Sequence, residues 1–294
     1  MAKILISVER GAARRLPCAR PSIPSVPAGG PVLADAVLSL LLVLCHGLAV
    51  PAAAARALAL AVRDAELRTW LRARPGGARH SLRRIAFARL ARQALKLFIL
   101  AGAERTALRR VDVEPETLPP GSCVWAIPHS AWLRLLAVWA KDRNAGLALA
   151  GNGWAGRLGT RSAGTDLHGL LRLVRHLRAG GRAAVAADSF VARDACEARF
   201  LGYPTRVSTV AVRVAAAGRV PVVPVWPSYA DGALRLEFGP AIPAPRDHAG
   251  QAETARALLD FFERRIARDP AQWNDLVPFF RKHARRAPHD TGTV

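Results

Sequence analysis

The sequence predicts an α/β fold: a central, mostly parallel sheet flanked by helices, with an N-terminal hydrophobic helix. Short apolar runs alternate with longer amphipathic runs from residue 123 onward, a pattern typical of strands connected by covering helices. The chain has 294 residues, 51% of them hydrophobic, and is long enough to bury a sizeable core. Residues 36–55 form a run of 20 without a charge, the length of a helix that spans a bilayer.

Three regions are expected along the chain. Residues 1–30 contain Pro, Gly and Arg without periodicity, which predicts a disordered basic N-terminus. Residues 31–75 are expected to form a membrane-associated helical segment, and residues 76–290 the α/β domain. A buried core helix with a kink at Pro51 is the alternative interpretation of the hydrophobic run.

The elements of the α/β domain follow in order. Residues 81–100 show nearly helical apolar spacing with Arg and Lys opposite, which predicts an amphipathic helix that covers a core or lies on a membrane. Helices are also expected directly after residue 129 and at 166–181, 206–218 and 251–269. The expected strands are 123–127, 147–151, 183–187, 220–226 and 230–238.

Composition and missing motifs restrict the function classes. The net charge of +21 favours polyanionic partners, either nucleic acid or an anionic membrane surface. Nucleic acid is not expected, because no aromatic-interleaved module of the RNP kind is visible. The four cysteines have no zinc or redox spacing, so no metal site is predicted and a reducing, cytoplasm-facing environment is indicated. The chain lacks a GxSxG elbow, a P-loop and a GxGxxG after a strand.

Two side chains follow predicted strands at the edge of the sheet where ligands bind. His129 comes directly after the strand 123–127, and Asp188 comes after the strand 183–187. A histidine titrates near neutral pH, so His129 is the candidate general base; a capping or surface histidine is the alternative. The start of the following helix offers free N–H groups for an oxyanion or a phosphate.

Four segments together resemble one family. The chain contains IPHSAWLRLLAVWA, RHLRAGGRAAVAADSF, ARFLGYPTRVSTVAVRVAAAGRVPVVPVW and IARDPAQWNDLVPFFRK, in this order. They resemble segments of the bacterial lipid A biosynthesis late acyltransferases, a branch of the lysophospholipid acyltransferase-like superfamily. The first is similar to the HxxxxD/E motif, and the last to an ending with Pro-Glu-Gln-Trp followed by basic residues. The resemblance covers roughly residues 35–287 and makes 76–290 the expected acyltransferase domain.

The resemblance implies an O-acyltransferase at the cytoplasmic face of the bacterial inner membrane. His129 would deprotonate a hydroxyl of a membrane glycolipid or related lipid, which then attacks an acyl thioester. No cofactor is implied, and acyl carrier protein or acyl-CoA would bring the acyl group as co-substrate. The implied substrate-binding residues are Arg161, Asp188, Phe200 and Gly202.

The sequence departs from the family at one position. Five residues after His129, where the family has Asp or Glu, stands Arg134. A cation cannot accept the imidazole N–H bond. In a first alternative another carboxylate, Asp188 or Asp166, replaces the acid. In a second, His129 works alone or Arg134 binds a phosphate. In a third, the protein is a catalytically impaired member that binds acyl lipid or acyl carrier protein without transfer.

Overall fold

The computed structural model describes most of the chain from residue 65 to residue 284. The described residues are 55, 59, 65–73, 81–88, 119, 121–130, 133–142, 147–150, 162–163, 166–190, 194–230 and 233–284. Contacts divide the chain into two units, Met1–Leu44 and Cys45–Val294, and all described residues belong to the second. The predicted N-terminal region 1–30 and the hydrophobic run, except Ala55, lie outside the described residues. No helix within the described ranges has the length and apolar character needed to cross a bilayer.

The central sheet is mostly parallel, as predicted. Its six strands stand in the order β3-β2-β4-β1-β7-β8. Five are mutually parallel, and β8 pairs antiparallel with β7 at one edge. The strands are β1 (Val124–Ile127), β2 (Leu147–Ala150), β3 (Ser162–Ala163), β4 (Arg182–Ala186), β7 (Val222–Ala230) and β8 (Ala233–Phe238). The four residues of β1 are all buried, because this strand lies between β4 and β7 in the interior of the sheet.

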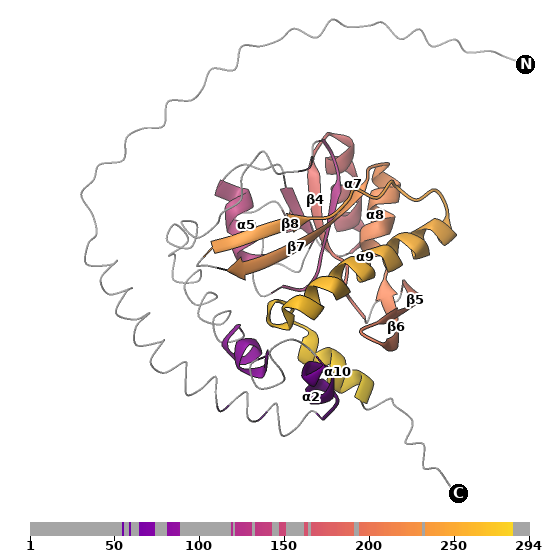
Figure 1. Ribbon diagram of the computed structural model, residues 1–294. Helices are drawn as coiled ribbons and strands as arrows, with labels where there is room; N and C mark the ends of the chain where they lie inside the picture. Colours follow the sequence, from indigo (N-terminus) through magenta and orange to yellow (C-terminus); the bar gives the residue numbers. More distant parts are fainter. Residues whose placement is uncertain are drawn as a thin grey trace, which may run out of the picture. The chain divides into compact units, whose positions relative to one another are not determined.

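Helices cover the sheet, and polar caps fix where several of them begin. The helices α7 (Leu167–Arg178), α8 (Val210–Gly218) and α9 (His248–Arg268) form a contiguous layer against the strands (Figure 1). The helix α5 (Leu133–Asp142) connects β1 to β2 in the opposite direction across the sheet, so right-handed crossovers place it on the other face. Asp166 begins α7 by accepting the Gly169 N–H at 2.8 Å, and Asp247 begins α9 in the same way.

A β-hairpin corrects one predicted element. Residues 206–218 were expected to be one helix, but α8 begins only at Val210. The preceding residues form β6 (Tyr203–Ser208), which pairs antiparallel with β5 (Ala195–Phe200). The turn between them places Leu201 and Gly202 at φ angles of 51° and 90°. Pairing with a partner strand therefore overrides the local helical preference of residues 206–208.

Two short helices near the ends of the described chain complete the core. The helix α2 (Ala65–Arg72) buries Leu67 and Leu71, which lie one turn apart on the same face. It contacts α10 (Leu276–Ala284), and Trp70 lies 5.3 Å from Phe280 between ring centroids. Residues 81–88, in the predicted amphipathic helix, are helical and bury Leu82 and Ile85. The core thus extends from the sheet to the C-terminal helix.

Candidate active site

The register of β1 and β4 brings the two predicted edge residues together. Ile127 of β1 is opposite Ala186 of β4. His129 and Asp188 each follow two residues later, at the carboxyl ends of adjacent parallel strands. The pairing continues past the strands, because the Ala187 N–H donates to the Ile127 carbonyl at 2.9 Å. Two chain segments 59 residues apart therefore present a histidine and a carboxylate at the same level of the sheet edge.

The carboxylate of Asp188 is buried and receives three N–H groups. Its Oδ1 atom lies 2.7 Å from His129 Nδ1. Its Oδ2 atom accepts the His129 backbone N–H at 2.8 Å and the Trp273 indole N–H at 2.7 Å. The Asp188 side chain is 0% exposed and that of His129 is 41% exposed. Because Nδ1 lies against the carboxylate, Nε2 is the ring nitrogen that can take a proton from a substrate.

The surroundings of His129 favour its protonated form. The hydrogen bond and the charge of Asp188 raise the pKa of His129 from 6.5 to about 9. Burial opposes this rise in the pKa, and the charge of Asp275 adds to it. Asp275 Oδ2 lies 3.7 Å from Nδ1, and its side chain is 33% exposed. The imidazole is therefore a stronger base than a free histidine, and its protonated form is favoured at pH 7.

His129, Asp188 and Asp275 are also the one group in the described ranges that could hold a metal ion. Their ligand atoms lie within 4.8 Å of one another. However, both oxygens of Asp188 already accept N–H groups, and one of these donors is a backbone amide that cannot move away. A metal ion bound to His129 Nδ1 would have to replace the hydrogen bond between Nδ1 and Asp188, so the three residues suit an orienting hydrogen-bond network better than a metal centre.

The other predicted site residues lie in different surroundings. Arg134 is in α5, and both its side chain and Arg161 lie outside the described part of the chain. Asp166 caps α7. Phe200 is buried and lies 5.5 Å from Trp273 between ring centroids, so it supports the site from inside the core. Neither Trp273 nor Asp275 was among the predicted site residues, although both lie in the segment IARDPAQWNDLVPFFRK that carries part of the resemblance.

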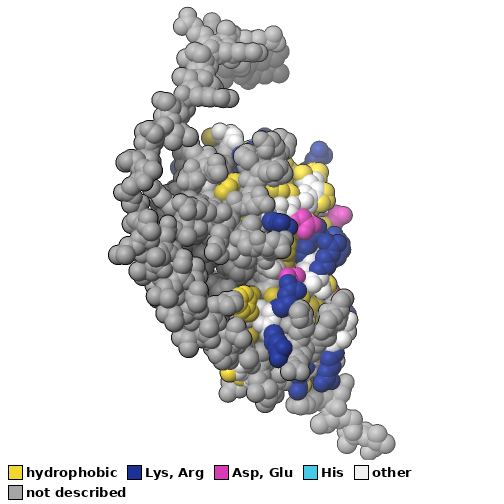
Figure 2. All heavy atoms as spheres, turned by 60° about the vertical axis from the view of Figure 1, so that its left-hand side comes forward, with side chains coloured by type: hydrophobic (Ala, Val, Ile, Leu, Met, Phe, Trp, Pro, Cys, Tyr) yellow, Lys and Arg dark blue, Asp and Glu magenta, His cyan; other side chains and the backbone are white. Residues whose placement is uncertain are grey.

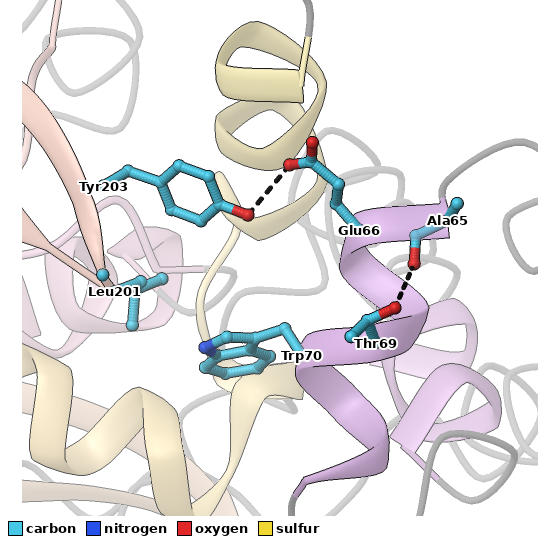
Figure 3. Close-up of a pocket in the computed structure, with 7 residues that line it drawn as sticks. Ala65, Glu66, Thr69, Trp70, Leu201 and Tyr203 are labelled. Atoms are coloured by element: carbon cyan, nitrogen blue, oxygen red, sulfur yellow. Dashed lines mark hydrogen bonds between the residues drawn. The ribbon is translucent and has the colours of Figure 1, made fainter. Parts of the chain in front are cut away.

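Gly202 belongs to a separate pocket. The pocket has a volume of about 450 Å³ and lies between α2 and the turn of the β5–β6 hairpin (Figure 3). The Tyr203 hydroxyl donates to Glu66 at 2.8 Å across it. Burial and the neighbouring Glu66 raise the pKa of Tyr203 to about 12. The residues lining this pocket are Ala65, Glu66, Thr69, Trp70, Leu201, Gly202 and Tyr203, so it does not include His129 or Asp188.

Basic side chains are abundant on the surface. On the face in Figure 2, Lys and Arg side chains of the described residues are more widespread than Asp and Glu. This distribution agrees with the net charge of +21. A surface of this sign attracts anionic ligands and anionic lipid surfaces.

The fold and the site define a class: an α/β protein with a histidine–carboxylate pair of the kind that serves in general-base catalysis. Residues 154–282 match the family described as bacterial lipid A biosynthesis acyltransferase. Over that stretch the chain is similar to this family, in agreement with the resemblance that its motifs indicated. The stretch includes Asp188, Trp273 and Asp275, and His129 precedes it. A comparison with curated proteins gave no match.

The raised pKa of His129 predicts a pH-dependent stability. The folded-state pKa of about 9 exceeds the unfolded value of 6.5. The contribution of protonated His129 to the free energy of unfolding is therefore fully present below pH 6.5 and is lost as the pH rises through 9. Urea unfolding of the wild type and of His129→Gln, which cannot titrate, should give a difference in unfolding free energy that declines across this window. Parallel curves for the two proteins would contradict the assignment. Asp188→Asn removes the hydrogen bond and the charge that raise the pKa of His129 most. In this variant the free energy of unfolding should therefore decline less between pH 6.5 and 9.

Proposed function

We propose that the protein is an O-acyltransferase that moves a fatty acyl group from a thioester donor to a hydroxyl of a membrane glycolipid or related lipid. The observation that carries this proposal is the pair formed by His129 Nδ1 and Asp188 Oδ1 at 2.7 Å, with the histidine ring partly open to solvent. The family match over residues 154–282 supports the acyl-transfer chemistry. Together they favour catalysis over the capping or surface role considered for His129.

The proposed reaction uses His129 twice. Nε2 of the neutral imidazole takes the proton of the acceptor hydroxyl while its oxygen attacks the thioester carbonyl. The tetrahedral intermediate then expels the thiol sulfur, which takes the proton back from Nε2. One C–O bond forms, one C–S bond breaks, and the products are an ester and a free thiol. Asp188 holds the ring by Nδ1 and stabilises its charge while the proton is on Nε2.

Asp188 takes the place of the acid missing from the sequence motif. Of the three alternatives for Arg134, this proposal adopts the first, in which a carboxylate elsewhere in the chain orients His129. Asp188 is supported by its distance to the ring, and Asp166 by contrast serves as the cap of α7. Binding of a donor or acceptor phosphate by Arg134 belongs to the second alternative, which a substitution at this position can test. Binding of the substrates is a role proposed for Arg161 and Gly202.

The proposed setting is the cytoplasmic face of the bacterial inner membrane. Residues 31–75 would attach the chain to the bilayer, and residues 76–290 would carry the acyltransferase domain. The donor would be acyl carrier protein or acyl-CoA, with no cofactor. The positive net charge of +21 supports an anionic membrane surface and an acidic or phosphorylated donor as partners.

Replacement of His129 tests the proposal directly. His129→Gln and His129→Ala should each lower acyl transfer by at least about a hundredfold, because the proton of the acceptor hydroxyl then has no base. Transfer is measured by mass spectrometry of the lipid product, with acyl carrier protein and acyl-CoA supplied separately. His248→Ala is the control, since His248 is exposed at the start of α9. Undiminished product from both His129 variants would exclude His129 as the base, whereas a wild type that binds the substrates and forms no product would favour a binding protein without transfer.

The raised pKa of His129 predicts the pH dependence of catalysis. Only the neutral imidazole can accept a proton, so kcat/KM should increase with pH until about 9. Asp275→Asn removes one cause of the raised pKa and should move this rise to lower pH. Asp188→Asn should move it further while also lowering the maximal rate. A wild-type rate that is already constant from pH 7 upward would contradict this assignment.

A substitution at Arg134 separates the alternatives for this position. If Asp188 is the acid, Arg134→Glu should leave transfer within about threefold of the wild type or raise it, because the ring is already oriented. Arg134→Gln is the matched variant that removes the cation without adding an acid. A large loss in both variants would assign Arg134 a positive role, such as holding a phosphate of donor or acceptor.

A further inference from the structure

The turn that follows the 3-10 helix before α10 contacts the proposed active site. This helix, η2 (Pro270–Gln272), leads into residues 273–275. Trp273 forms an isolated β-bridge with Ser130, and the Asn274 N–H donates to the His129 carbonyl at 2.9 Å. The turn therefore contacts the backbone at the His129 carbonyl and at the residue that follows it. A segment far along the chain thus helps to fix the position of the proposed base.

The Trp273 side chain reaches deeper than its backbone, to the buried carboxylate. Its indole N–H donates to Asp188 Oδ2 at 2.7 Å, and the residue is 2% exposed. The same oxygen accepts the His129 backbone N–H. Two donors on Oδ2 define the plane of the carboxylate and leave Oδ1 directed at His129 Nδ1. A buried carboxylate that lost one donor would be less well satisfied and freer to rotate.

The Trp273 ring is itself held by aromatic neighbours. Phe190, Phe200 and Phe279 lie 6.2, 5.5 and 5.7 Å from it between ring centroids. At the other end of η2, Asp269 accepts the Gln272 side-chain amide at 3.0 Å. The indole N–H is therefore presented by a rigid cluster, and its direction does not depend on a substrate.

We propose that Trp273 is a positioning residue of the acyl-transfer site, whose indole N–H holds Asp188 in the orientation that aligns the His129 ring. The inference rests on the proposed function and extends it to the C-terminal segment. Trp273 acts through Asp188 and does not touch the reacting atoms. Its removal should therefore lower kcat and leave KM for both substrates nearly unchanged.

Trp273→Phe tests the proposal, because it keeps an aromatic ring and removes only the N–H donor. We expect kcat to fall by about ten- to a hundredfold, the range for a lost hydrogen bond to a charged group. Trp226→Phe is the matched control: it makes the same change in another buried tryptophan, whose ring lies 6.5 Å from Phe262. Urea unfolding of both variants measures any loss of stability.

A double-mutant cycle shows whether Trp273 acts through Asp188. If it does, Trp273→Phe combined with Asp188→Asn should be no slower than Asp188→Asn alone. If Trp273 had a purely structural role, Trp273→Phe would instead slow the reaction by a similar factor in the wild type and in Asp188→Asn. Additive losses, or a Trp273→Phe rate equal to that of Trp226→Phe, would overturn the proposal.

An NMR titration of the His129 ring in the absence of substrate distinguishes this inference from the proposed function. Trp273→Phe should move the His129 titration from about 9 toward 6.5, and Trp226→Phe should not. An unchanged titration would overturn the positioning role. If the wild type formed no lipid product while the titration moved, Trp273 would still orient the pair, but the acyl-transfer function itself would have failed.

Discussion

The site depends on one hydrogen bond, between His129 Nδ1 and Asp188 Oδ1, and this bond depends on the register of two parallel strands. Ile127 is opposite Ala186, so His129 and Asp188, each the second residue beyond its strand, meet at the same edge. A shift of the register by one residue would turn the two side chains to opposite faces of the sheet. The interior position of β1, between β4 and β7, protects the register, because both of its edges are paired.

The sequence predicted the positions of the two residues and left their pairing as one of three alternatives. Apolar runs ending at 127 and 187 were enough to place His129 and Asp188 at the carboxyl edge of a parallel sheet. The order of the strands comes from crossovers and long-range pairing, which no local pattern records. Because the strand order was unknown, Asp166 was also a candidate for the carboxylate that orients His129. Its actual role is local, since an aspartate three residues before Gly169 can cap the first turn of α7.

Non-local contacts also explain what sequence reasoning missed. Residues 206–208 look helical together with the segment that follows, yet they pair with β5 across the Leu201–Gly202 turn. Trp273 is 85 residues from Asp188, and the tryptophan appeared in the sequence only as part of a motif without an assigned role. Both are cases in which tertiary pairing decides the conformation or the partner of a residue.

In the proposed mechanism the acid comes from the end of the neighbouring strand β4 and not from the following helix, and this changes what keeps His129 aligned. An acid five residues after His129 would be held by a single helix and would depend on local geometry. Asp188 instead depends on the β1–β4 register and on two donors at Oδ2, one of them from the C-terminal turn. The cation at Arg134 is tolerable on this arrangement because the imidazole N–H already has an acceptor. The cost is that the alignment of His129 becomes coupled to the packing of residues 269–284, a segment that would otherwise only complete the core.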